Sequence, residues 1–131
     1  MEKEKKVCLK IDENGNRRWY KNELLHREDG PAVELNDGTK YWLINDQLHR
    51  VDGPALEWNN GTKMWYIKGK RHREDGPAVE AINGSKIWII NGQLHREDGP
   101  AVEGSNGNKW WFLNGKEYSR EDYAKNPKFL T

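Results

Sequence analysis

The chain has 131 residues, a length typical of one domain that can bury its own core. Its 22 basic and 21 acidic side chains leave a net charge of +1, which gives no global attraction to nucleic acid or to anionic lipid. Only 34% of the residues are hydrophobic, seven tryptophans supply much of that area, and no run approaches the roughly 18 apolar residues of a membrane span.

The first segment, MEKEKK, is charged and lacks the apolar core of a signal peptide. Val7, Leu9 and Ile11 then occupy alternate positions, which predicts a strand that opens a half repeat over residues 7–24. This strand would form one edge of a sheet, either blunted by the charged leader or paired with a second copy in a homodimer. Cys8 is the only cysteine, so no internal disulfide can form and a cytoplasmic setting is favoured.

Four copies of a 23-residue repeat follow, at 25–47, 48–70, 71–93 and 94–116. In the second copy, His-Arg-x-Asp-Gly-Pro precedes a predicted strand over 55–58, and Asn59-Asn60-Gly61 predicts a hairpin turn. A second strand is expected over 63–67 and a second turn over 68–70. Each repeat is therefore predicted to be a β-hairpin with a polar connector, and stacked copies would share one core.

These elements predict an all-β fold, an elongated and twisted antiparallel sheet or solenoid of about nine strands and on the order of 40 Å in length. Residues 117–131 would cap it. Ser119-Arg120-Glu121-Asp122 has the signature of a helix start, and Tyr123 and Phe129 would hold that helix against the last hairpin. We expect one domain over residues 1–131.

The pattern Trp-x-x-Asn-Gly-x-x-His, followed by Gly, a strand, and Asp-Gly or Asn-Gly, resembles MORN repeats and their bacterial variants over residues 7–116. The resemblance implies β-hairpin repeats in an elongated sheet, with roles as protein scaffolds, lipid-associated modules or antitoxin-like proteins. This chain departs from the pattern by inserting Arg-Glu-Asp before Gly-Pro, so the resemblance does not carry MORN-type lipid binding to it.

Residues that recur in every copy favour a scaffold over a reaction centre. The histidines would lie near 10 Å apart, too far for shared zinc coordination, so each is expected to donate to a neighbouring carbonyl or carboxylate. Each connector arginine is expected to bind an aspartate of its own or the next repeat, and the recurring lysines and glutamates are expected to pair across each hairpin. The four sets are His26, His49, His72 and His95; Arg27/Asp29, Arg50/Asp52, Arg73/Asp75 and Arg96/Asp98; Lys40, Lys63, Lys86 and Lys109; and Glu34, Glu57, Glu80 and Glu103.

The tryptophan strands are apolar on both faces, whereas a half-exposed strand alternates with polar residues. One face is nearly constant, with Trp42 and Ile44 in the first full copy. The other varies between copies, with Tyr41/Leu43, Met64/Tyr66, Ile87/Ile89 and Trp110/Phe112. The varying face is predicted either to pack inside the fold or to present an aromatic surface to a partner.

We expect a non-enzymatic protein-interaction module, because no nucleophile set, phosphate loop, metal motif or cofactor motif is present. Its partner would be another protein, bound by steric occlusion, and in a bacterial or phage protein this would make it an antitoxin-like or anti-defence inhibitor. The predicted partner-binding residues are Tyr41, Trp58, Tyr66, Trp110, Phe112 and Val51, the last of which replaces the glutamate of the other connectors.

Two alternatives remain open. Bases could stack on the same aromatic residues, with Arg18, Lys68, Lys70 or Arg71 meeting phosphate in a nucleic-acid or nucleotide binder. Alternatively, the N-terminal edge strand could join copies into a self-assembling structural protein. A concentration-independent monomer would exclude the second alternative, and weak salt dependence would argue against the first.

Overall fold

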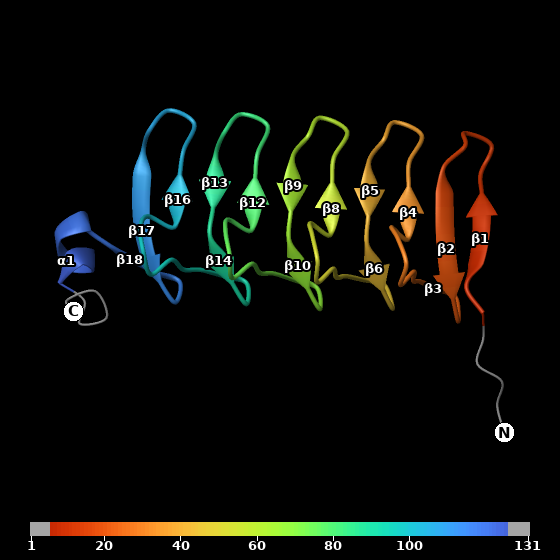
Figure 1. Cartoon of the computed structure of the whole chain (residues 1–131), viewed down its shortest axis with the longest axis horizontal. Helices are drawn as coiled ribbons and strands as arrows, with labels where there is room; N and C mark the ends of the chain where they lie inside the picture. Colours follow the sequence, from red (N-terminus) through yellow and green to blue (C-terminus); the bar gives the residue numbers. More distant parts are fainter. Residues whose placement is uncertain (1–5, 126–131) are drawn as a thin grey trace, which may run out of the picture. The chain divides into compact units, whose positions relative to one another are not determined.

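The computed structural model describes residues 6–125 as an all-β, hairpin-rich chain with one short helix, which confirms the predicted class. The described part contains 18 strands, paired antiparallel (Figure 1). It divides into two compact units at Gly69. Phe129 and the first five residues of the charged leader lie outside the described residues.

The first unit covers residues 6–69 and begins with the predicted N-terminal strand. Its strands follow one another in a meander, in the order β1-β2-β4-β5-β8-β9, while β3 pairs with β2, and β6 with β7 (Figure 1). The strands are β1 (Cys8–Ile11), β2 (Arg17–Lys21), β3 (Leu24–Leu25), β4 (Val33–Glu34), β5 (Lys40–Tyr41), β6 (Leu43–Ile44), β7 (Gln47–Leu48), β8 (Leu56–Glu57), β9 (Lys63–Met64) and β10 (Tyr66–Ile67).

The second unit covers residues 70–125 and repeats this plan. Its meander runs β12-β13-β16-β17-β18, and β14 pairs with β15. The elements are β11 (Lys70–Arg71), β12 (Val79–Glu80), β13 (Lys86–Ile87), β14 (Ile89–Ile90), β15 (Gln93–Leu94), β16 (Val102–Glu103), β17 (Lys109–Leu113), β18 (Lys116–Tyr118) and α1 (Arg120–Ala124).

The strand count is twice the predicted one, because the long tryptophan strand is interrupted in the first three full copies and the second turn forms a hairpin of its own. At Trp42, the amide donates to the carbonyl of Ala55, and the Trp42 carbonyl accepts from His49, so this residue leaves the β4–β5 ladder. The chain then makes the hairpin β6–β7 around Asn45-Asp46. Both turn residues have positive φ, 47° and 66°, the combination that a two-residue hairpin turn requires.

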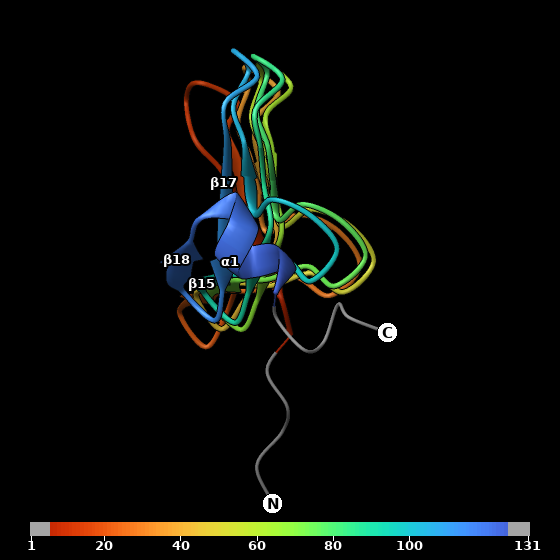
Figure 2. The same ribbon diagram turned by 90° about the vertical axis from the view of Figure 1, so that its left-hand side faces the viewer.

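Pairing across the strands sorts the side chains into two rows. In the first unit, one row carries Val33, Tyr41, Leu56 and Met64, and the other carries Glu34, Lys40, Glu57 and Lys63. In the second unit, the rows are Val79, Ile87, Val102 and Trp110, and Glu80, Lys86, Glu103 and Lys109. The buried core lies on the apolar side, where Ala32, Val33 and Leu43 form a cluster. The connectors bulge to one side of the strands in each unit (Figure 2).

The C-terminal helix forms where the sequence predicts it. The Ser119 hydroxyl oxygen accepts from the Asp122 amide at 3.1 Å and caps the first turn of α1. Tyr123, only 7% exposed, points back to the last connector, where its hydroxyl donates to the Arg96 carbonyl and accepts from the Gly99 amide. The predicted cap is therefore confirmed for Tyr123.

Candidate binding surfaces

Each connector is organised around its arginine. The guanidinium carbons of Arg27, Arg50 and Arg96 lie 3.9, 4.0 and 3.7 Å from the ring centroids of Trp19, Trp42 and Trp88, in that order. In all four connectors, the arginine Nε donates to the aspartate two residues later at 2.9 to 3.1 Å, and Nη1 donates to the following proline carbonyl. The predicted arginine–aspartate lock is confirmed, in its within-connector form. Sequence reasoning did not foresee the tryptophan beneath the arginine.

The recurring glutamates form ion pairs with these arginines, which the sequence analysis did not predict. Glutamate and lysine do lie opposite each other in the ladder, as at Glu34 and Lys40. The recorded ion pairs nevertheless join the glutamates to connector arginines at 3.4, 3.7, 3.6 and 3.1 Å: Arg27–Glu34, Arg50–Glu57, Arg73–Glu80 and Arg96–Glu103. The guanidinium is already held by three other contacts. It therefore loses less side-chain conformational entropy on pairing with the glutamate than a mobile lysine would lose.

The histidines link each connector to the next small hairpin. His26, His49, His72 and His95 accept at Nδ1 from the backbone amides of Asn45, Lys68, Asn91 and Asn114, each 19 residues further on. In three copies Nε2 lies 3.3 to 3.5 Å from the connector glutamate, as predicted, but Val51 takes that glutamate's place beside His49.

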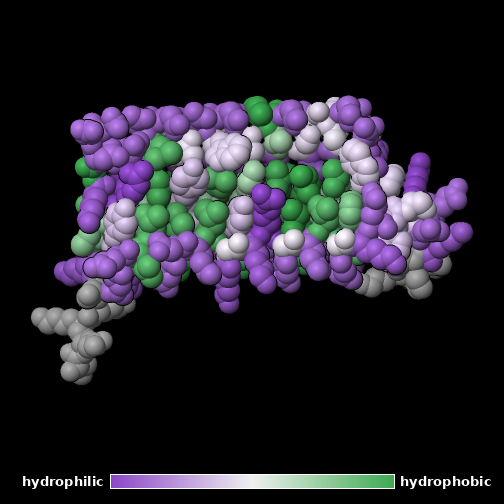
Figure 3. All heavy atoms as spheres, turned by 180° about the vertical axis from the view of Figure 1, so that it is seen from behind, coloured by the Kyte–Doolittle hydropathy of each residue, from purple (hydrophilic) through white to green (hydrophobic). Residues whose placement is uncertain are grey.

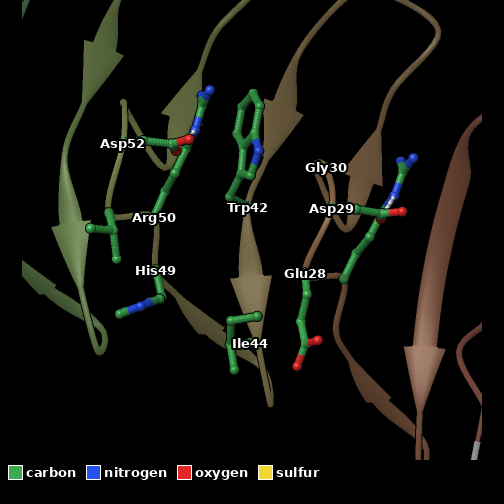
Figure 4. Close-up of a pocket in the computed structure, with 10 residues that line it drawn as sticks. Glu28, Asp29, Gly30, Trp42, Ile44, His49, Arg50 and Asp52 are labelled. Atoms are coloured by element: carbon green, nitrogen blue, oxygen red, sulfur yellow. Dashed lines mark hydrogen bonds and ion pairs between the residues drawn. The ribbon is translucent and has the colours of Figure 1, made fainter.

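Between consecutive connectors, the surface forms an open groove. In the first unit, a groove of about 830 Å³ lies between the connectors that start at Arg27 and Arg50, and Trp42 and Ile44 form its floor (Figure 4). In the second unit, a groove of about 750 Å³ lies between the connectors that start at Arg73 and Arg96, over Trp88 and Ile90. The constant face of the tryptophan strand is thus only partly covered. The sequence signal for these grooves is the Trp-x-Ile pair, which is predicted only to form the nearly constant face of the strand.

The opposite face of each unit carries a band of apolar side chains bordered by polar ones (Figure 3). Leu43 and Ile89 are buried there, while Trp58 and Trp110 are 42% and 39% exposed. The centre of this face is therefore packed, as the internal-core alternative predicts. The indoles of Trp58 and Trp110 on the same face are partly exposed to solvent.

The predicted partner-binding residues fall on both faces. Tyr41 packs against the core cluster, and the carbonyls of Tyr66 and Phe112 accept from the amides of Arg50 and Arg96. By strand alternation, Tyr41, Trp58 and Tyr66 lie on the apolar face of the first unit, and Trp110 and Phe112 on that of the second. Val51 is 82% exposed and lines the first groove, so it lies apart from the other five.

The N-terminal strand β1 leaves its apolar side chains open. Leu9 and Ile11 are 45% and 58% exposed, and β1 pairs with β2 on one side. Its use in homodimer formation stays a prediction. Over residues 6–125, no group of three or more His, Cys, Asp or Glu side chains could hold a metal ion. Nor does that part of the chain contain a helix with the length and apolar character that crossing a bilayer requires.

Comparisons with known proteins add no relative. No protein-family model matches the chain, and no curated protein shows significant sequence similarity to it.

Proposed function

We propose that this chain is a non-enzymatic protein-interaction module that binds another protein through the apolar faces of its units. The observation that carries the proposal is the exposure of Trp58 at 42% and of Trp110 at 39%, each on the apolar face of its own unit. Large indoles held on a rigid sheet are typical anchors of protein interfaces, since they bury much area at little entropic cost.

The polar connector residues, which are of the types that catalysis commonly uses, support a binding role. The connector histidine, arginine and aspartate of each copy are engaged in the same structural contacts as their counterparts in the other copies. Such groups hold the chain in place and have no separate reactive geometry in any one copy. Binding by occlusion, as in an antitoxin-like or anti-defence inhibitor, needs only a stable surface of this kind.

A relationship to MORN-type repeats is part of the proposal, as is a cytoplasmic setting. The antiparallel hairpins that recur in the copies, such as β4–β5 and β8–β9, support the relationship. The Arg-x-Asp inserted in the connectors distinguishes this chain from the MORN pattern. It has a physical role, since it brings the guanidinium onto the indole.

Capture from a lysate of the native host, followed by mass spectrometry and titration of the captured protein, tests the proposal. The W58A/W110A variant should bind that protein at least tenfold more weakly, a modest loss for two interface tryptophans. The matched control is I82A, which removes an exposed apolar side chain, 66% accessible, elsewhere in the chain. Circular dichroism should show that all the proteins are folded. Equal affinity of W58A/W110A and I82A would reject the apolar face as the binding surface.

A further inference from the structure

We propose that the connector grooves form a second binding site, which takes the arginine or lysine side chains of a basic, extended peptide segment. This site lies on the face opposite the exposed tryptophans and is independent of the function proposed above. It rests on the open indole at the floor of each groove and on the charge at its rim.

The floor offers one free face of an indole. Arg50 covers one face of Trp42, with 4.0 Å between the guanidinium carbon and the ring centroid. Figure 4 shows Trp42 between the two connectors, with Arg50 on one side and Asp29 and Gly30 on the other. The second face of the indole is therefore turned towards Asp29 and Gly30, across the groove. Cations stack on indole faces, and a nearby carboxylate adds to the attraction.

The rim presents negative charge, while the positive charge lies behind it. The side chains of Glu28, Asp29 and Asp52 are 76%, 87% and 86% exposed, whereas those of Arg27 and Arg50 are 23% and 24% exposed. Both arginines are also balanced, because each pairs with its own aspartate and with a sheet glutamate. A ligand that enters this groove meets carboxylates first, which favours a cationic side chain and opposes phosphate.

The second unit repeats the arrangement with one more acid. Arg96 covers Trp88 at 3.7 Å, and Glu74 and Asp75 stand at the rim with side-chain exposures of 82% and 86%. Glu97 occupies the position that Val51 has in the first groove. Each groove combines an indole with carboxylates from two connectors, so it suits a segment with neighbouring basic residues better than a single small cation.

The test titrates the full chain with a short peptide of alternating arginine and glycine, followed by calorimetry and by the indole N–H NMR signals of Trp42 and Trp88. Those two signals should shift on binding. The E28Q/E74Q variant should bind about fourfold more weakly, at about twofold for each lost exposed ion pair. The matched control E13Q/E117Q makes the same change of charge at exposed positions outside the grooves. It should weaken peptide binding by less than half as much as E28Q/E74Q does.

A gain of affinity gives the sharper result. V51E restores the rim carboxylate that the other connectors carry, and should bind the peptide about twofold more tightly, with the increase seen at Trp42 and not at Trp88. W58A/W110A should bind it as the wild type does, which separates this site from the apolar face. Absence of binding, equal binding of a citrulline peptide, or equal affinities for E28Q/E74Q and E13Q/E117Q would each overturn the proposal.

Discussion

The guanidinium of Arg50 makes contacts in four directions. It donates to Asp52 and to the Pro54 carbonyl, pairs with Glu57 at 3.7 Å, and covers Trp42. These contacts satisfy a charge that is largely buried, and they join the connector to the sheet and to the tryptophan strand at one point. The arginine of each connector therefore fixes where the connector turns, and through it where the groove lies.

Gly53 has no side chain because the guanidinium occupies that space. A Cβ at Gly53 would lie 2.8 Å from Cζ of Arg50, closer than side chains approach. G53A should lower the free energy of unfolding by about 1–3 kcal/mol, because the arginine must leave its contacts or the backbone must shift. In an R50A background, the same substitution should cost almost nothing. Urea unfolding of the four proteins in this cycle checks the prediction, and additive losses would contradict it.

At the scale of the element, the histidines connect parts that are distant in sequence. His26 is 4% exposed, and its Nδ1 accepts from the amide of Asn45 in the turn between β6 and β7. H26A leaves that amide without its acceptor in a partly buried position, so we expect a loss of about 1–3 kcal/mol in unfolding free energy. Hydrogen exchange at the Asn45 amide should also become faster. Unchanged protection of Asn45 would show that the histidine does not hold the turn.

Helix α1 is held by a buried hydroxyl. Burial raises the pKa of Tyr123 above its model-compound value of 10.0, while the hydrogen bond from Gly99 acts in the opposite direction. Since the folded state favours the protonated phenol, this contribution is present below pH 10 and is lost as the pH rises through the raised pKa. Wild type should therefore lose unfolding free energy more steeply than Y123F above about pH 10. Parallel pH profiles for the two proteins would contradict the assignment.

Elements set by local residues could be predicted from the sequence, and those set by distant contacts could not. Asn91-Gly92 defines its turn through its own backbone preferences, and Ser119 caps its helix three residues away. The interruption at Trp42 depends instead on the Ala55 carbonyl of the next copy. The grooves were missed for the same reason, because their depth depends on how far each connector stands from the sheet, which no short pattern encodes.

At the scale of the whole molecule, some positions of the repeat hold the fold and others face solvent. Side chains that are the same in each copy hold the connectors and turns, as Arg50 does, while the position beside it varies and faces solvent. Substitutions at exposed positions such as Val51 and Trp58 should therefore leave the contacts that fold the chain unchanged.

Residues 50 and 51 are neighbours in the chain, one holding the fold and the other exposed to solvent. They allow the most direct test of this difference in role. The unfolding free energies of R50A and V51E should be measured by urea denaturation under one set of conditions. R50A should lose about 2–4 kcal/mol, because it breaks charged hydrogen bonds and uncovers an indole. V51E should stay within about 0.5 kcal/mol of wild type, since Val51 is 82% exposed. A loss in V51E as large as that in R50A, or no loss in R50A, would contradict the account.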